Sequence, residues 1–405
     1  MVRAVAKRMP GPLRIALAAG LLLSASLVVI GTNAATAGAS TNEPIVLGDI
    51  CSCTGPEASS IAQTSPTIQA WASWENSHGG IDGHKVEVIV KDDGYNPGTA
   101  LSDATQLVTS DHVVAIFDNS DVDTSWASYI EQQKVPGIGG LDTAAGYTNP
   151  DFFPQGGTYQ FETTVGVQTA KQAGVKKEAD LYCVEVAICA QSSAQLKSSL
   201  AKAGLSLVYS AGIGFAAPNY TAQCLAAKQS GATAMTVADA SAIVAKVASE
   251  CAAQGYTPTQ FSADGSVSIS WLTTAGMEGN VDNQPDLPWF VHNDATKTFY
   301  DELDKYAPSV PTSPNFGEIA MSTWAAGIEV QEAIQAGNVT ATPTAAEITD
   351  GLYHLPAGTT LGGLSPPIHF EKGKIASNPC FYTMGIKNHK FVLLNSGKLV
   401  CATKN

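Results

Sequence analysis

Apolar residues in this chain follow two kinds of spacing, and each spacing predicts one kind of element. Short runs rich in Val, Ile and Phe, bounded by turn residues, are typical of buried strands, whereas apolar residues every three or four positions are typical of helices. In the first part of the chain we predict strands at 43–50, 85–90, 113–117 and 135–138, and helices at 67–77, 97–110 and 126–133. This alternation favours a parallel sheet with helices on both faces.

A second alternating series follows residues 140–164, which are rich in Gly, Thr, Asn and Pro. We predict its helices at 169–173, 192–203, 221–229 and 241–254, and its strands at 180–186, 206–209, 232–237 and 260–263. Two further helices are predicted at 297–306 and 318–336, and a hairpin at 381–394 that turns at Asn388-His389.

Three stretches with many turn residues, 140–164, 279–288 and 355–368, separate these series. They indicate three crossings between two lobes. The sequence therefore predicts an α/β fold of two Rossmann-like lobes joined by a three-stranded hinge, which is a clamshell. We expect lobe 1 to comprise residues 41–155 and 286–362, and lobe 2 to comprise residues 156–285 and 363–405.

Residues 1–37 are predicted to form a signal peptide. A basic segment precedes an apolar run from Ile15 to Ile30, and Ala35-Thr36-Ala37 fits a cleavage site. The run of 16 residues is short for a membrane-spanning helix, and an uncleaved anchor is the alternative. After cleavage, we expect the remaining chain to act outside the cytoplasm, in the periplasm, at the cell surface or as a secreted protein.

Charge narrows the range of partners. All three arginines lie in the predicted signal peptide, so the remaining chain has 18 lysines, no arginine and all 36 acidic residues, a formal net charge of −18. Such a chain repels nucleic acids and anionic membranes. It also lacks the forked guanidinium donor that binds carboxylates and phosphates with two hydrogen bonds.

Eight cysteines after a secretion signal predict disulfides, because exported proteins meet an oxidising environment. Spacing favours the local pairs Cys183–Cys189, Cys224–Cys251 and Cys380–Cys401, which leaves Cys51 and Cys53. These two face the same way in an extended segment, and with no histidine nearby a metal site is disfavoured. A Cys51–Cys53 disulfide and separate disulfides to other cysteines both stay open; we expect either to stiffen the following loop.

Three stretches resemble the type I periplasmic solute-binding proteins of branched-chain amino-acid ABC importers, the Leu/Ile/Val-binding protein-like family. They are 54-TGPEASS-60, 79-GGIDGHKVEVIVKDDGYNPGTA-100 and 113-VVAIFDNSDVDTSWASYIEQQKVPGI-138. The resemblance is good over residues 44–150 and continues by pattern and spacing to the C-terminus. It implies a two-lobed fold that closes on a small ligand and delivers the ligand to a membrane permease.

The resemblance also places ligand-binding positions. It puts Ser60 where amino-acid binders have an aromatic residue, and Asp121 near a hydroxyl that meets the ligand carboxylate. A small residue and a threonine fall on Thr143 and Ala144, and loops of the second lobe fall near Cys189 and on Asp239 and Ala240. The carboxylate that pairs with a ligand ammonium falls on Asp264. Ser60 and Asp121 differ from the family pattern.

The residues themselves point to the same loops, since ligands of open α/β sheets bind at the carboxyl ends of the strands. Six loops lie at these strand ends, and the first of them runs from Thr54 to Ser60. Each loop contains an acidic residue and a hydroxyl residue, and none contains Lys, Arg or His. An Asp in such a loop also serves as a helix cap or turn residue. We expect a small zwitterionic, amide or cationic ligand, no cofactor, no metal and no nucleic acid.

The favoured function is that of the solute-binding component of an ABC importer, acting as a monomer. A ligand-sensing subunit of the same fold is the first alternative. A secreted α/β enzyme is the second, although the sequence has no evident nucleophile–base or metal constellation.

Overall fold

Two separate sheets carry the fold, as the sequence predicts. The computed structural model of the chain describes residues 42–140, 145–262, 266–337, 339 and 341–403. The first sheet has the order β2-β1-β3-β4-β5, with all neighbours parallel. Its strands are β1 (Ile45–Cys51), β2 (Val86–Asp92), β3 (Ile116–Asn119), β4 (Gly137–Gly139) and β5 (Phe152–Phe153). Strand β2 lies on one side of β1, and β3 and the later strands lie on the other. The position between β1 and β3, where the strand order reverses, is where open α/β sheets bind ligands.

The second sheet begins with the same order, β7-β6-β8-β9-β10, and adds β11 and β12 as antiparallel strands. Its strands are β6 (Lys177–Cys183), β7 (Ser206–Ile213), β8 (Ala234–Ala238), β9 (Thr259–Ser262), β10 (Val281–Gln284), β11 (Cys380–Ile386), β12 (Phe391–Leu393) and β13 (Val400–Cys401), which pairs with β11. The predicted hairpin turns at Asn388-His389, where both residues have positive φ angles.

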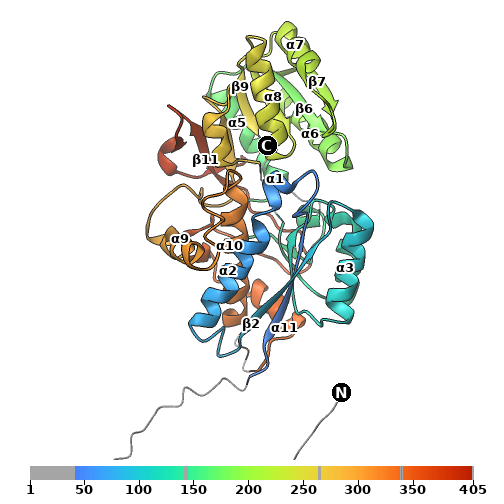
Figure 1. The fold of residues 1–405 in the computed structure, drawn as a ribbon, viewed down its shortest axis with the longest axis vertical. Helices are drawn as coiled ribbons and strands as arrows, with labels where there is room; N and C mark the ends of the chain where they lie inside the picture. Colours follow the sequence, from blue (N-terminus) through green and yellow to red (C-terminus); the bar gives the residue numbers. More distant parts are fainter. Residues whose placement is uncertain (1–41, 141–144, 263–265, 338, 340, 404–405) are drawn as a thin grey trace, which may run out of the picture. The chain divides into compact units, whose positions relative to one another are not determined.

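Helices cover both faces of the first sheet (Figure 1). Helices α3 (Pro97–Thr109) and α4 (Ala127–Gln133) lie on one face, and α2 (Thr64–Ser77) and α10 (Glu318–Ala336) on the other. Helices α9 (Asp294–Tyr306) and α11 (Ala345–Tyr353) pack on α2 and α10, although they follow the second sheet in sequence. The chain therefore returns to the first sheet before it adds β11–β13 to the second.

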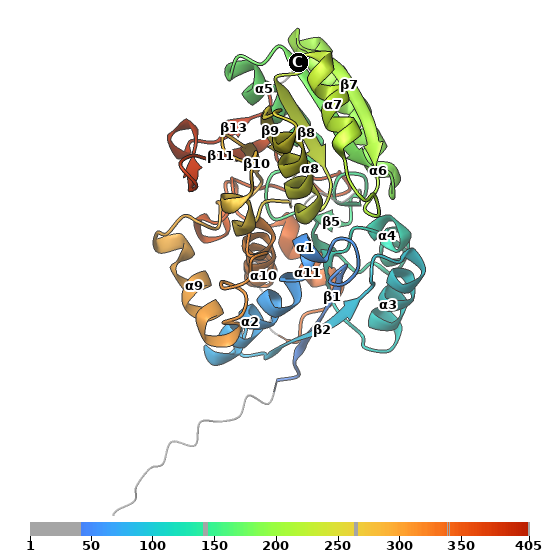
Figure 2. The ribbon, with the colours of Figure 1, turned by 45° about the horizontal axis from the view of Figure 1, so that its top comes forward.

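Helices also cover the second sheet from both faces (Figure 2). Helices α5 (Tyr159–Gln172) and α6 (Ala187–Ala203) pack on one face, and α7 (Thr221–Ser230) and α8 (Ser241–Ala253) on the other. Buried side chains such as Leu181, Met235 and Val237 fill the second face.

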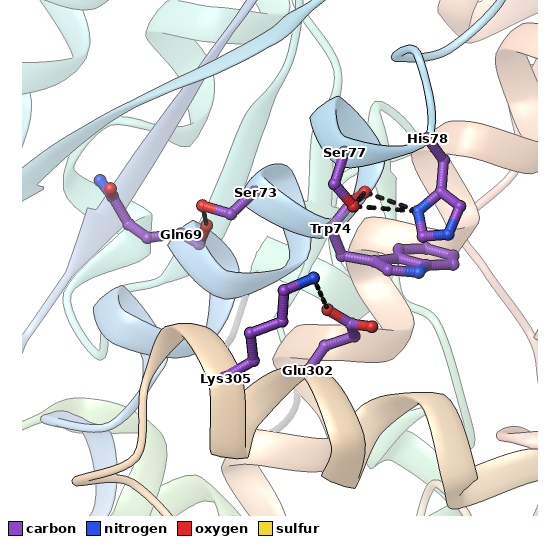
Figure 3. A network of polar contacts seen from close by, with 7 residues as sticks. All are labelled: Gln69, Ser73, Trp74, Ser77, His78, Glu302 and Lys305. Atoms are coloured by element: carbon purple, nitrogen blue, oxygen red, sulfur yellow. Dashed lines mark hydrogen bonds and ion pairs between the residues drawn. The ribbon is translucent and has the colours of Figure 1, made fainter.

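The end of α2 shows how local polar contacts terminate a helix of the first lobe. The side chains of Ser77 and His78 both reach back to the backbone carbonyl of Trp74, and Ser77 lies 3.2 Å from His78 Nδ1 (Figure 3). Gly79 and Gly80 follow with positive φ angles, which stops the helix at the predicted position.

Two predictions about elements need correction, and two helices are additional. Helix α5 begins at Tyr159, ten residues before the predicted 169. The prediction missed its first turns because they are polar and lack an apolar period. Strand β10 lies inside the stretch 279–288, where no strand is predicted, since its buried residues Asp282, Asn283 and Gln284 are polar. Helices α1 (Ala58–Ile61) and α11 are additional elements.

Candidate functional site

One buried carboxylate holds together the three loops at the β1/β3 end of the first sheet. Asp93, which is 2% exposed, follows β2. Its Oδ1 accepts hydrogen bonds from Ser52 Oγ (2.9 Å) and from the backbone N–H of Tyr95 (2.7 Å), and its Oδ2 accepts one from Ser120 Oγ (2.5 Å). Ser52 follows β1 and Ser120 follows β3, so this carboxylate fixes the loops of three neighbouring strands.

The neighbouring acid, Asp92, is exposed and binds the backbone of the same loops. Its Oδ1 accepts hydrogen bonds from the backbone N–H of Thr54 (3.1 Å) and of Gly94 (3.0 Å). Tyr95 then adopts a φ angle of 64°, a left-handed conformation that costs about 1 kcal/mol or more for a residue other than glycine. The two acids compensate for this cost and direct the Tyr95 side chain to the cavity described next.

A cavity of about 350 Å³, which we call the main cavity, lies at the carboxyl ends of strands from both sheets. Its carboxylates come from five residues: Glu57, Asp121, Asp123, Glu185 and Asp239. Its hydroxyls come from Ser60, Tyr95, Thr124, Ser125, Tyr159 and Ser266. Among its described lining residues there is no Lys, Arg or His. The lining therefore favours a positive charge and opposes an uncompensated negative one.

Asp239, directly after β8, is the clearest acceptor in the main cavity. Its Oδ1 accepts a hydrogen bond from the backbone N–H of Ala240 (2.8 Å), while its Oδ2 is buried without a protein partner. Burial raises the pKa of Asp239 to about 7; the bond from Ala240 opposes this, and the charge of Glu185 adds to it. A bound cation would favour the ionised form and supply the missing partner.

Tyr95 brings an aromatic ring among these acids. Burial raises the pKa of its phenol well above the usual value, and the charges of Asp121, Glu57, Glu185 and Asp239 raise it further. The hydroxyl therefore stays protonated and remains a hydrogen-bond donor. An electron-rich ring surrounded by carboxylates is a suitable neighbour for an ammonium group.

The serines of α1 meet the start of α8. Ser60 Oγ accepts a hydrogen bond from the backbone N–H of Ser241 (3.0 Å), and Ser59 Oγ accepts one from Ala242 (3.1 Å). Helix α8 has no capping side chain of its own, because its N-cap residue is Ala240. A loop after β1 in the first sheet therefore caps a helix that covers the second.

Comparison with known proteins decides the family. A family model described as periplasmic binding protein matches residues 44–390. The chain belongs to the periplasmic binding protein family. No curated protein sequence matches the chain.

Solved structures similar to this periplasmic binding protein share its two-lobed fold. A branched-chain amino-acid ABC transporter protein from Thermus thermophilus with bound valine has 15% sequence identity and a TM-score of 0.76, and the match covers 87% of this chain and 96% of that one. A fatty acid ABC transporter substrate-binding protein from Thermomonospora curvata has 18% identity and a TM-score of 0.74, with 88% and 92% covered. A solute-binding protein from R. palustris in complex with benzoate has 14% identity and a TM-score of 0.72, with 88% and 98% covered. At this identity the likeness shows the fold alone.

Four disulfides fasten this periplasmic binding protein, and they join Cys51–Cys53, Cys183–Cys189, Cys224–Cys251 and Cys380–Cys401. Spacing favours the last three of these pairs, and of the two alternatives left open for Cys51 and Cys53 the structure has the disulfide between them. Cys183 and Cys189 both line the main cavity and connect the end of β6 to the first turn of α6. Cys51 and Cys53 lie under the α1 loop, where Cys51 packs on Ile61.

The structure places the predicted site residues in three groups. Ser60, Asp121 and Asp239 line the main cavity together. Thr54 is exposed, and Ala240 is buried behind Asp239; neither lines the cavity. Thr143, Ala144 and Asp264 lie outside the described residues.

Sequence reasoning overlooked Tyr95 and Tyr159 as lining residues. Tyr95 has a recognisable signal, since it follows Asp92-Asp93-Gly94 at the end of a strand. Tyr159 lacks one, because it begins a helix whose start has no apolar period.

No group of three His, Cys, Asp or Glu side chains in the part of the chain that the structure describes is arranged to hold a metal ion. None of the helices described there is long and apolar enough to cross a membrane.

Proposed function

We propose that this protein is the extracytoplasmic solute-binding component of an ABC importer, and that its ligand is a small molecule with at least one ammonium group. The observation that carries this proposal is the main cavity of about 350 Å³, with five carboxylates and no basic side chain among its described lining residues. Membership of the periplasmic binding protein family supports the transport role.

Charge is the argument for the ligand class. An anion in the main cavity would face five acids, with no basic partner among the lining residues that the structure describes. An ammonium group would instead receive charge-assisted hydrogen bonds, which are about twice as strong as neutral ones. Asp239 has a buried oxygen without a protein partner, so it is the acid that we propose as the main ammonium acceptor.

An amino-acid-like zwitterion also fits. Val186 and Ile188, at the start of α6, line the main cavity, and α6 has no capping side chain. The partial positive charge of this 17-residue helix favours a carboxylate near its N-terminus. The ligand's carboxylate would then lie at α6 and its ammonium at Asp239. The proposed lobe boundaries, 41–155 with 286–362 and 156–285 with 363–405, put these two groups on the same lobe.

The decisive experiment is a thermal-shift screen followed by calorimetry. The panel holds basic and neutral amino acids, amides, simple amines and matched carboxylic acids. We expect ammonium-bearing compounds to raise the melting temperature and acids without an amine to have no effect. If only the carboxylic acids stabilise the protein, the proposed ligand class is wrong.

Import is tested separately from binding. Cells that lack this chain should lose uptake of the radiolabelled ligand and regain it when the chain is restored. If uptake is unchanged while binding holds, the protein is a ligand-sensing subunit of the same fold.

A further inference from the structure

A second cavity, of about 60 Å³, adjoins the main cavity inside the second lobe. We call it the inner cavity. It lies on the sheet face covered by α5 and α6, and it shares Tyr159 and Ala238 with the main cavity. The Tyr159 hydroxyl is hydrogen-bonded to Ser192 Oγ, which also lines the inner cavity. The two cavities are therefore neighbours with this hydroxyl pair in their common wall.

The inner cavity contains buried acids without a basic partner in the described lining. Glu178 and Asp180 lie two positions apart on β6, so they face the same side of the sheet. Glu178 is 2% exposed and Asp180 is 1% exposed. Asp180 Oδ2 accepts hydrogen bonds from the hydroxyls of Ser193 and Ser210.

Glu178 provides the observation that points to a ligand. Its Oε1 accepts a hydrogen bond from Thr236 Oγ1 (2.6 Å), but its Oε2 is buried and has no protein partner. Burial raises the pKa of Glu178 to about 7, which the bond from Thr236 opposes and the charge of Asp180 increases. A buried carboxylate oxygen without a donor destabilises the folded protein, so a donor that enters the inner cavity removes this cost.

The donor most compatible with the inner cavity is an ammonium group on a chain. No metal-binding cluster exists among the described residues, whereas an ammonium needs only hydrogen-bond acceptors within reach. Val167, Leu196 and Phe261 add apolar surface that suits methylene groups. A cavity of about 60 Å³ is large enough for such a head group.

We propose that the inner cavity binds a second ammonium group of an elongated ligand whose first ammonium lies in the main cavity. This inference rests on the proposed function, and it names the ligand class as α,ω-diamines. The methylene chain passes between Tyr159 and Ala238 once the Tyr159–Ser192 hydroxyl pair separates. Glu178 and Asp180 receive the second ammonium, and Asp239 the first.

Calorimetry with unbranched α,ω-diamines and the matching monoamines tests the proposal. We expect at least one diamine to bind roughly tenfold or more tightly than its monoamine, because the second charge gains its own charge-assisted bonds. Glu178→Gln should remove most of that advantage and leave monoamine affinity unchanged, since the amide oxygen still accepts from Thr236. Asp239→Asn, the matched control, should weaken both kinds of ligand.

A steric variant keeps the test valid if Glu178→Gln does not fold. Gly166 lines the inner cavity from helix α5, and a Cβ there would meet only Asn283 Nδ2, at 3.6 Å. Gly166→Ala should therefore fold and melt no lower than the wild type, because alanine has a higher helix propensity than glycine. It should still reduce the diamine advantage, since it narrows the cavity.

The outcomes separate the two proposals. If monoamines bind but no diamine binds more tightly, the inner cavity is not a ligand compartment and the proposed function stands. If potassium or ammonium chloride alone raises the melting temperature of the wild type but not of Glu178→Gln, the occupant is a free cation and the diamine proposal is overturned. If no amine binds at all, the proposed function fails with it.

Discussion

The Ser59→Ala substitution tests the contact between α1 and α8 without changing a residue that lines the main cavity. Ser59 does not line the main cavity, but its Oγ accepts the 3.1 Å hydrogen bond from Ala242. Ser60 makes the matching 3.0 Å bond to Ser241 and does line the cavity. Ser59→Ala therefore changes the bond between the two lobes without touching the binding site.

The expected free-energy cost of removing either hydroxyl is that of losing a helix N-cap, about 0.5–2 kcal/mol. Ser60 is 7% exposed, so its bond should lie towards the upper end of this range, and the half-buried Ser59 towards the lower end. Because the bond exists only when α1 meets α8, its loss lowers the population of the binding-competent arrangement. We expect Ser59→Ala to weaken ligand affinity by roughly two- to fivefold.

Calorimetric affinities for the best ligand of the screen provide the assay, with melting temperatures recorded in parallel. Ser60→Ala and the double variant complete a cycle, and the two effects should add, since each hydroxyl meets a different N–H. Ser73→Ala is the matched control, because this half-buried serine donates its hydrogen bond to the Gln69 carbonyl within α2. If Ser59→Ala binds as tightly as Ser73→Ala, the contact does not contribute to closure.

Four further results are expected. Asp93→Ala should weaken ligand binding by about tenfold or more, because three loops lose their common hydrogen-bond acceptor. An unchanged affinity would contradict this role of Asp93. Burial raises the folded-state pKa of Asp49 to about 7 and of Asp286 to about 6, so the folded state takes up protons that the unfolded state binds only near pH 4. The melting temperature should therefore rise as pH falls from about 8 to about 5, and a steady decrease over this range would refute the prediction. Affinity for an ammonium ligand should fall as pH drops through about 7, where Asp239 becomes protonated, and a pH-independent affinity would remove Asp239 as its partner. Asp264→Asn stays a prediction from the resemblance: it should cost about 2–4 kcal/mol of binding if the ligand has an ammonium, and a loss under about threefold would exclude it.

The sequence predicted the fold well where elements have a clear apolar period. The order of strands and helices from β1 to β4 follows from runs such as Val86–Asp92 and from the helix start at Pro97. Strand β10 could not be found in this way, because a buried strand made of Asp282, Asn283 and Gln284 has the composition of a loop. Asp282 and Asn283 accept hydrogen bonds from Ser262 on β9 and Thr383 on β11, which composition does not reveal.

The candidate site was predictable by position but not by contact. The rule that ligands bind at strand ends brought Ser60, Asp121 and Asp239 to one cavity. That Ser60 caps α8 depends on a hydrogen bond between residues 181 positions apart, and no local pattern encodes it. Likewise, Glu178 reads as an ordinary strand residue until the fold leaves its Oε2 without a donor.

The disulfide between Cys183 and Cys189 has a consequence for how the protein must be produced. It joins the end of β6 to the first turn of α6, and both of its cysteines line the main cavity. Expression in a thiol-reducing cytoplasm would leave this part of the cavity wall unfastened, whereas export to an oxidising compartment would close it. Protein recovered from the two routes should fold alike but differ in ligand affinity. Binding screens therefore belong with the exported protein.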